Sequence, residues 1–368
     1  MKLIIVEDDN DQITSYLDTI TALNELDGGQ IDNPKVVKTL TEALAAIENE
    51  PFDAAILDLK LSSNQNETQG NEVIKLIVNL KRFPVFVYSA YLGDIDSSIP
   101  ESFFFQKFEK TTPIRDLLIK LRDIYKTGVT RILGANGLIE NHLTKIFWNH
   151  IAESFEDLSR NGINEKQLLR YITGHLYEYL EMGDTAGSFE RYLPEEVYIK
   201  PPIKQKYFTG SIVKEKNSEK KFIILTPSCD IANCKAEHVL LALIYSLTTG
   251  LVRGLKSEAT KTIRVGLSVG RRQVAEDKKK KAEDDLKRLF RNNYSPKYYF
   301  LPPSRNFEGG LINFQDLESV EHPGTMSDRF DIIATVNSQF LKDIVARFAF
   351  YYSRQGAPEI EFSIADLP

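Results

Sequence analysis

The sequence predicts an α/β fold: a doubly wound, parallel five-stranded domain, followed by a helical connector and a β-rich, barrel-like α+β domain. Short apolar runs alternate with helical patterns over residues 1–125, as in doubly wound parallel sheets. Amphipathic stripes dominate residues 126–200, and strand-like runs separated by polar turns dominate residues 201–368. We therefore expect three domains with these bounds, the last with a helical insertion near 271–297.

The charge of the 368-residue chain is unevenly distributed. Residues 1–125 hold 12 Lys and Arg against 21 Asp and Glu, whereas the other 243 residues hold 34 against 31. An acidic front part and a weakly basic back part indicate two modules with different tasks. The net charge of −6 argues against a dedicated nucleic-acid-binding protein, although a local basic patch is compatible with it.

Apolar stretches and cysteines indicate the setting of the protein. The longest strongly apolar stretch, residues 239–247, is too short to cross a bilayer. Acids beginning at Glu7 interrupt the apolar N-terminal run, which is not the pattern of a signal peptide. Two cysteines in a chain of this length do not make a disulfide framework. We therefore expect a soluble, cytoplasmic protein that does not associate with membranes.

The front part contains five apolar runs that end abruptly, as buried parallel strands do. The expected strands are 2–7, 36–37, 53–57, 84–90 and 103–108. Helical periodicity predicts helices at 11–25, 40–47, 73–80 and 113–125. In such a sheet the functional site lies at the carboxyl ends of the strands.

Polar residues stand where four of these strands end, so we expect them to meet at one edge of the sheet. They are, in chain order, Glu7, Asp8, Asp9, Asp58, Ser89 and Lys110. Clustered carboxylates repel each other unless a cation neutralises them, and hard oxygen ligands with open water positions favour Mg²⁺. A metal-held carboxylate can attack a phosphoryl group, while a nearby ammonium and hydroxyl stabilise the transferred oxygens.

Residues 1–125 resemble the receiver domain of two-component response regulators, through the segments IIVEDD, LDL around Asp58, YSA with Ser89 and EK with Lys110. The resemblance implies that Asp58 accepts a phosphoryl group and becomes an aspartyl phosphate. It implies that Ser89 is the switch hydroxyl and that Lys110 contacts the phosphate. It also implies an Mg²⁺ site whose ligands are Glu7, Asp8 and Asp58. The implied partner is a sensor histidine kinase or a phosphotransfer protein.

Two features depart from the usual receiver pattern. Receivers usually have a proline four residues after the acceptor, whereas this chain has the polar insert 62–69 there, which lengthens a loop beside the site. The spacing from Ser89 selects Lys110 as the site lysine. The aromatic switch position at Phe104 instead selects Lys107, so both lysines are candidates.

The middle of the chain predicts a hinge followed by helices. Residues 126–137 contain several glycines, which favour a hinge. Apolar stripes in residues 138–182 predict long helices that serve either as a homodimer face or as a lever for the signal of the front part. A DNA-binding helix-turn-helix is not favoured here, because the segment lacks a short glycine turn and a basic recognition helix.

The back part opens with strand-like runs at 208–213, 221–227 and 238–246. Residues 201–250 resemble the opening of MazF/PemK-type SH3-like barrels, whose toxin members cut RNA with an arginine and a threonine or serine. The charged loop of this chain offers Lys220 and Lys221 instead of that arginine. Further strands are expected at 297–303 and 309–314, and a closing helix at 341–356.

A cysteine-containing segment in the back part has three interpretations. Cys229, Cys234 and His238 could hold zinc, or Cys229 could be a nucleophile with a histidine partner. The third interpretation, which we expect, is a turn with Cys229 buried, because the C-x₄-C-x₃-H spacing is not a strong zinc pattern.

The segment 271–297 holds ten Lys and Arg against five Asp and Glu. It predicts a charged helix that is either a solvated face or a contact for phosphates.

Together these observations predict a phosphorelay response regulator, phosphorylated on Asp58 to switch a β-rich output or interaction domain. The alternatives are a phosphorylation-controlled nuclease on a MazF-like barrel and a transcription regulator that binds DNA through residues 271–297. Whether the output domain is an enzyme stays open, and a non-enzymatic output is favoured.

Overall fold

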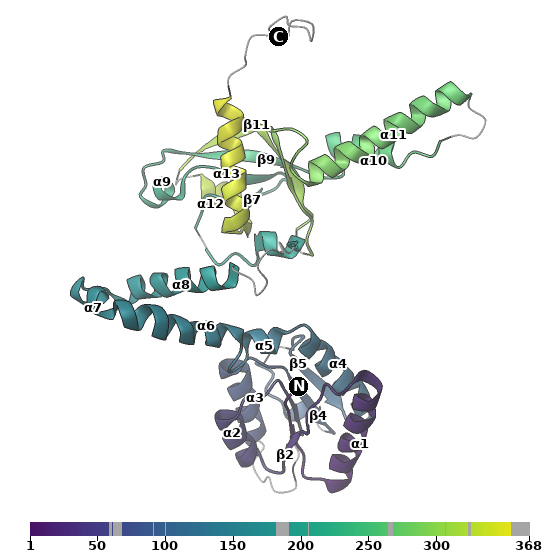
Figure 1. The fold of residues 1–368 in the computed structure, drawn as a ribbon, viewed down its shortest axis with the longest axis vertical. Coiled ribbons are helices and arrows are strands. Elements are labelled where there is room, and N and C mark those ends of the chain that lie inside the picture. Colours follow the sequence, from purple (N-terminus) through teal and green to yellow (C-terminus); the bar gives the residue numbers. More distant parts are fainter. Residues whose placement is uncertain are drawn as a thin grey trace, which may run out of the picture. The chain divides into compact units, whose positions relative to one another are not determined.

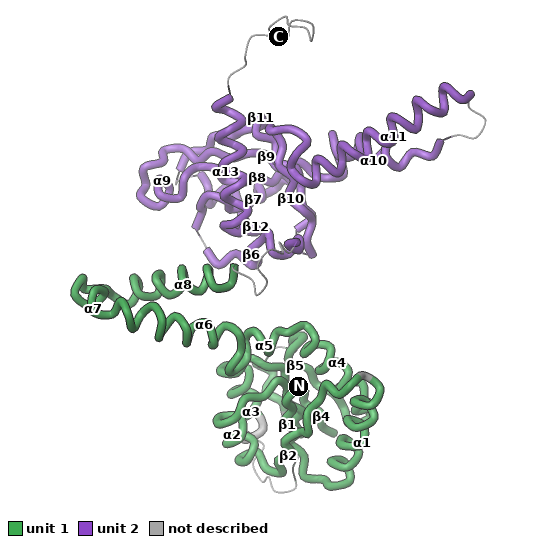
Figure 2. Tube along the Cα trace, in the orientation of Figure 1, with its two compact units in different colours: residues 1–188 green, residues 189–368 purple. Residues whose placement is uncertain are grey.

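The chain forms two compact units, Met1–Ser188 and Phe189–Pro368 (Figure 2), each with its own hydrophobic core. The structure is a computed structural model, and it describes residues 1–58, 61, 68–90, 92–99, 101–181, 191–204, 206–263, 268–305, 307–322 and 325–354. Most of the polar insert expected at 62–69 therefore lies outside the described residues, as does the expected end of the last helix at Gly356.

The first unit is built on a parallel sheet. Its strands are β1 (Leu3–Val6), β2 (Lys35–Val37), β3 (Ala54–Leu57), β4 (Val85–Ser89) and β5 (Phe105–Glu109). They pair in the order β2-β1-β3-β4-β5, and every pair is parallel (Figure 1). This is the flavodoxin-like order, whose topological switch point lies between β1 and β3. The expected five-stranded, doubly wound fold is confirmed.

Helices cover both faces of this sheet, which is why every residue of β1, β3 and β4 is buried. The helices are α1 (Asn10–Asp27), α2 (Leu40–Asn49), α3 (Thr68–Leu80) and α4 (Ile114–Lys126). Ile4 and Val6 of β1 pack with residues of α2 and α3, whereas Leu3 and Ile5 pack with residues of α1 and α4. The alternation of side chains along a strand thus divides the core into two layers.

A helical hairpin follows the sheet in the first unit. Its helices are α5 (Val129–Leu133), α6 (Leu138–Ile146), a π-helical turn (Phe147–Ile151), α7 (Ala152–Arg160) and α8 (Glu165–Glu181). Helix α8 packs back against α6, where the rings of His142 and Tyr179 stack with centroids 5.2 Å apart. The segment 126–137, which was expected to be a hinge, contains the short helix α5. In α7 and α8 no residue is buried.

The second unit is built on a seven-stranded antiparallel sheet. Its strands are β6 (Tyr198–Ile199), β7 (Ser211–Glu215), β8 (Lys221–Ile224), β9 (His238–Tyr245), β10 (Tyr298–Leu301), β11 (Gly310–Glu321) and β12 (Phe330–Val336). They pair in the order β10-β11-β9-β8-β7-β12-β6. The expected β-rich fold of the back part is confirmed, although β6 and β12 were not predicted from the sequence.

The helices of the second unit cover and extend this sheet. They are α9 (Ser228–Ala232), α10 (Gly250–Ala259), α11 (Val269–Phe290), α12 (Met326–Arg329), α13 (Ser338–Ser353) and a 3₁₀ turn (Pro194–Val197). Helix α13 packs on one face of the sheet, around the fully buried Ile344. Gly210 permits this close approach: its φ is 83°, and a Cβ there would lie 2.8 Å from the side chain of Leu341.

The expected charged helix near 271–297 is α11. It pairs with α10 to form a hairpin between β9 and β10 that extends away from the sheet (Figure 1). Only Ala282 and Leu289 of α11 are buried, and Leu289 packs with Val252 of α10 at the base of the hairpin. No helix among the described residues is long and apolar enough to span a membrane.

Candidate functional site

The carboxyl edge of the parallel sheet brings the sequence-predicted residues together. Glu7 follows β1 and Asp58 follows β3, the two strands of the topological switch point. Their backbones continue the sheet ladder: the amide of Glu7 donates to the carbonyl of Val37 over 3.0 Å, and that of Asp58 donates to the carbonyl of Val6 over 2.9 Å. Both carboxyl groups are therefore held by rigid strands.

Lys110 joins the two acids. Its Nζ lies 2.6 Å from Oδ2 of Asp58 and 2.9 Å from Oε2 of Glu7. Glu7 is 1% exposed and Asp58 is 4% exposed, so both carboxylates have lost almost all of their water. An ammonium between two buried carboxylates offsets their mutual repulsion and part of their desolvation. Lys110 itself stays partly open to solvent, with 23% of its side chain exposed.

The surroundings of Lys110 favour its charged form. Burial alone would lower its pKa, but the hydrogen bonds and negative charges of Asp58 and Glu7 outweigh burial and raise the pKa above its ordinary value. Lys110 is therefore a permanent positive charge at this edge under physiological conditions.

Two tyrosines that the sequence analysis missed complete the site. The Tyr16 hydroxyl donates to Oε2 of Glu7 over 3.0 Å, and the amide of Asp9 donates to Oε1 of Glu7 over 3.2 Å. The Tyr88 hydroxyl donates toward the carbonyl oxygens of Lys110 and Thr112, over 3.2 and 2.8 Å, and so secures the loop after β5. Burial is the main cause that raises the pKa of Tyr16, and the negative charge of Glu7 raises it further.

The missed tyrosine had a signal in the sequence. The buried side chains of α1 are Tyr16, Ile20 and Leu23. A tyrosine one turn before the apolar residues Ile20 and Leu23 is on the core face, where its hydroxyl needs an acceptor.

The second lysine candidate has different contacts. Lys107 lies within β5, and its Nζ is 3.7 Å from Oε1 of Glu101 and 5.8 Å from the centre of the Phe105 ring. The ion pairs of Lys110, by contrast, are with the two site carboxylates.

The remaining predicted residues lie at the same edge. Ser89 is the last residue of β4 and is fully buried, and Asp8 follows Glu7 in a half-buried position. Asp9 is the N-cap of α1, where its side chain accepts hydrogen bonds from the amides of Asp11 and Gln12. Asp9 therefore has a structural task that the sequence analysis did not assign.

The donor chemistry of this edge fits a hard divalent cation. Glu7 and Asp58 converge on one positive charge, the ammonium of Lys110, and both offer only oxygen ligands. As the side chains stand, no three or more His, Cys, Asp or Glu groups within the described ranges are arranged to hold a metal ion.

The cysteine segment of the second unit differs from expectation. Cys229 and Cys234 are free thiols and both are exposed, so the expected burial of Cys229 is wrong. Cys229 lies in the short helix α9, in which only Ile231 is buried; Ser228 and Asp230 are half-buried. The Cys229 thiol lies 3.6 Å from Oδ1 of Asp230.

No protein-family model matches the chain, and no curated protein matches its sequence. Among solved structures, a CheY-like receiver domain of a response regulator from Methylobacillus flagellatus is 23% identical, with 33% of this chain and 98% of that chain covered at a TM-score of 0.26. A CheY-like receiver domain protein from Methanospirillum hungatei is 24% identical, with 34% of this chain and 94% of that chain covered at a TM-score of 0.25.

A third similar structure is the receiver domain of a sensor histidine kinase from Pseudomonas aeruginosa, with a magnesium ion coordinated in its active-site cleft. It is 17% identical, with 33% of this chain and 94% of that chain covered at a TM-score of 0.27. These similar structures are CheY-like or related receiver domains, and each covers about the N-terminal third of this chain.

Proposed function

We propose that the protein is a response regulator of a phosphorelay in which Asp58 accepts a phosphoryl group. An Asp58 oxygen attacks phosphorus, the bond from phosphorus to the phosphohistidine nitrogen breaks, and the released imidazole retains the nitrogen electron pair and takes up a proton. The single observation that carries the proposal is the contact of Lys110 with both Asp58 and Glu7, at 2.6 and 2.9 Å. A cation in that position can follow the transferred phosphoryl oxygens.

The proposed Mg²⁺ ligands are Glu7, Asp8 and Asp58. Bound there, the metal would shield the phosphoryl oxygens from the buried carboxylates, which otherwise repel them. Ser89 is the proposed switch hydroxyl and Lys110 the proposed phosphate-contacting lysine. Lys107 is not favoured for that task, because it contacts Glu101 instead.

Intact-mass analysis after treatment with acetyl phosphate and Mg²⁺ tests the proposal. The wild type should gain one phosphoryl group, and Asp58→Asn should gain none. Asp53→Asn is the matched control, because Asp53 directly precedes β3 and so lies at the end of the strand opposite to Asp58. The Asp53 carboxylate accepts a hydrogen bond from the backbone amide of Lys2, and the side-chain oxygen of an asparagine can accept the same bond. Equal incorporation in Asp58→Asn and wild type would reject Asp58 as the acceptor.

The proposed domain arrangement follows from this activity. Residues 1–125 form the receiver, 126–200 the helical connector and 201–368 the output domain. A sensor histidine kinase or a phosphotransfer protein is the proposed donor. Phosphorylation adds about −1.5 to −2 charge to an acidic domain. We propose that the resulting movement of the loops after β4 and β5 alters self-association through the helices of 138–182.

The second candidate is a nucleic-acid-binding output, favoured by the α10–α11 hairpin. Lys261, Arg271, Lys278 and Lys279 line a cavity of about 470 Å³ in this hairpin, and Glu258 is the one acid among its lining residues. Glu258 pairs with Lys261 over 3.3 Å, whereas the described residues provide no ion pair for the other three cations. Unpaired cations gathered on one surface are suited to a phosphate backbone.

Gel-shift titrations with DNA and RNA at several salt concentrations test this candidate. Changing Arg271 and Lys278 to Gln together should weaken binding and reduce the slope of log affinity against log salt by about 2. Changing Lys280 and Lys281 to Gln is the control, because these residues of the same helix do not line the cavity. If the wild type binds neither DNA nor RNA, the nucleic-acid-binding candidate is rejected and a protein-interaction output remains.

A further inference from the structure

One crossover of the parallel sheet differs from the others. The connections from β1 to β2, from β2 to β3 and from β3 to β4 each carry an α-helix, namely α1, α2 and α3. Between β4 and β5 the described residues form only a 3₁₀ turn, Leu92–Asp94, and Ile95 and Ile99 pack into the core from this connection. Strand β5 is accordingly only partly covered: Phe105 is its one buried residue, and the residues after it are half-buried or exposed.

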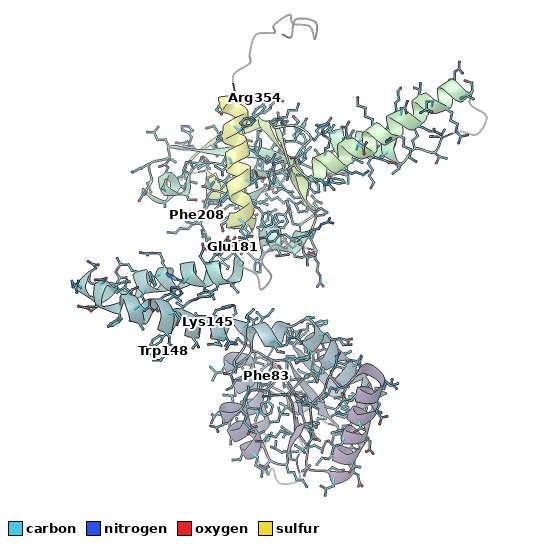
Figure 3. The ribbon with its side chains drawn as sticks, viewed as in Figure 1. Phe83, Lys145, Trp148, Glu181, Phe208 and Arg354 are labelled. Atoms are coloured by element: carbon cyan, nitrogen blue, oxygen red, sulfur yellow. The ribbon has the colours of Figure 1, made fainter. Side chains whose placement is uncertain are left out.

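An apolar pocket of about 390 Å³ opens at this place. The end of α3, the first residues of β4 and β5 and the connector helix α5 all contribute to its walls. Its apolar lining includes Ile77, Phe83 (labelled in Figure 3), Phe104, Val129 and Leu133. These residues lie at the amino ends of β4 and β5, opposite the edge that carries Asp58. The volume is in the range of pockets that hold small molecules.

One buried polar group in this lining finds no hydrogen-bond partner in the part of the chain that the structure describes. Thr130 is 3% exposed, and its hydroxyl makes no hydrogen bond to any described residue. Its carbonyl, by contrast, accepts a hydrogen bond from the amide of Gly134 over 2.7 Å. A buried hydroxyl without a partner is costly, and a ligand that supplies an acceptor would remove the cost.

Two cations also line the pocket. Arg82 is paired with Glu140 of α6 over 2.7 Å, which joins the end of α3 to the connector. Lys81 is half-buried, and no ion pair is described for its ammonium group. Apolar walls, one unpartnered hydroxyl and one unpaired ammonium together match a ligand with an apolar body and a single anionic oxygen group.

We propose that this pocket is a binding site for a small monocarboxylic acid with an apolar body, such as a medium-chain fatty acid. The aliphatic body lies among the apolar walls, the Thr130 hydroxyl donates to the carboxylate, and Lys81 neutralises it. Because α5 forms one wall, the bound acid contacts both the sheet and the first helix of the connector. This site is separate from the phosphoryl-acceptor edge and does not depend on phosphorylation.

Calorimetric titration of octanoate into the full chain, without a phosphodonor, tests the proposal. Saturable binding of one octanoate is expected, with hydrogen-exchange protection in 77–85 and 129–133. Octanol should bind at least about tenfold more weakly, because it lacks the charge. Thr130→Val, which keeps the shape but removes the hydroxyl, and Lys81→Gln should each weaken octanoate binding by about tenfold.

Lys145→Gln is the control, because Lys145 (Figure 3) is a cation of α6 that does not line the pocket. Its affinity for octanoate should equal that of the wild type. Circular dichroism establishes whether each variant is folded. If Thr130→Val does not fold, the result for Lys81→Gln decides the outcome. The proposal is overturned by the absence of both saturable heat and protection, by equal binding of octanol, or by wild-type affinity in the pocket variants.

Discussion

The hydroxyl group of Tyr16 donates a 3.0 Å hydrogen bond to Oε2 of Glu7, the same oxygen that lies 2.9 Å from the ammonium of Lys110. One oxygen of a buried carboxylate thus serves two donors from different elements, α1 and the loop after β5. The contact ties the acid at the end of β1 to the helix that covers it. It also explains why a tyrosine occupies this core position of α1.

Tyr16→Phe should therefore destabilise the first unit. The change removes a buried hydrogen bond to a charged acceptor and leaves the ring in place, so we expect a loss of about 1–3 kcal/mol in the free energy of unfolding. Urea denaturation followed by circular dichroism measures the loss. Tyr125→Phe is the control, because no hydrogen bond is described for the Tyr125 hydroxyl. Equal stability of Tyr16→Phe and wild type would show that the contact contributes nothing.

The stability of the first unit should fall at alkaline pH. Folding raises the pKa of Tyr16 above its ordinary 10.0 and that of Lys110 above its ordinary 10.5. The folded state then binds more protons than the unfolded state, so this stabilisation is present below these values and is lost as pH rises beyond them. Urea midpoints measured between pH 8 and about 11.5 should decline above about pH 10. In Tyr16→Phe the decline should be shallower, and an identical decline would contradict the assignment.

Lys110→Ala should have a larger effect than Lys107→Ala. Removal of Lys110 leaves two buried carboxylates without their cation, which should cost up to about 3 kcal/mol, since the 23% exposure of Lys110 makes the cost smaller than in a fully buried pair. Lys107 makes one 3.7 Å ion pair with the exposed Glu101, so its loss should cost less than about 1 kcal/mol.

Magnesium should distinguish the two lysine variants further. Mg²⁺ can replace the missing positive charge, so it should raise the melting temperature of Lys110→Ala more than that of Lys107→Ala. Hydrogen exchange measures the conformational response to acetyl phosphate, and this response should be smaller in Lys110→Ala than in Lys107→Ala. The opposite ranking in both measurements would assign the site lysine to Lys107.

The helical hairpin should associate with a second copy. Trp148 (Figure 3), Phe155 and Leu169 are 65, 60 and 64% exposed, and large apolar side chains gathered on a hairpin favour an interface. Changing Phe155 and Leu169 to Glu should abolish any increase in mass that beryllofluoride induces in light scattering. Leu26→Glu, a change at a 70% exposed position of α1, should leave it unaltered. An unchanged mass of the wild type with beryllofluoride would contradict association through the hairpin.

The parallel sheet and its polar edge were predictable from the sequence because the evidence is local. Each strand is a short apolar run, and the residues that follow, such as Glu7 and Asp58, are polar. Tyr16 was missed because its contact with Glu7 depends on the rotation of α1 against the sheet, which an apolar stripe fixes only approximately. Which of Lys107 and Lys110 contacts the two site carboxylates depends on where β5 ends. The spacing in the sequence was compatible with either lysine.

The second unit was less predictable because its pairings are non-local. Strand β12 lies beside β7 although more than 100 residues separate Phe330 from its partner Glu215. The sequence between β9 and β10 contains two helices, of which only α11 was expected, since α10 begins with glycine and has few apolar residues. The exposed position of Cys229 follows from the packing of α9 through Ile231, which composition does not reveal.

The most direct test of the account is to trap the phosphorylated residue chemically. Borohydride reduces an aspartyl phosphate to homoserine, and peptide mass spectrometry then locates the change within the chain. After treatment with acetyl phosphate and Mg²⁺, the account predicts homoserine at position 58 and at no other aspartate. Reduction at Asp8 or Asp9 instead, or no reduction anywhere in a folded protein, would contradict it.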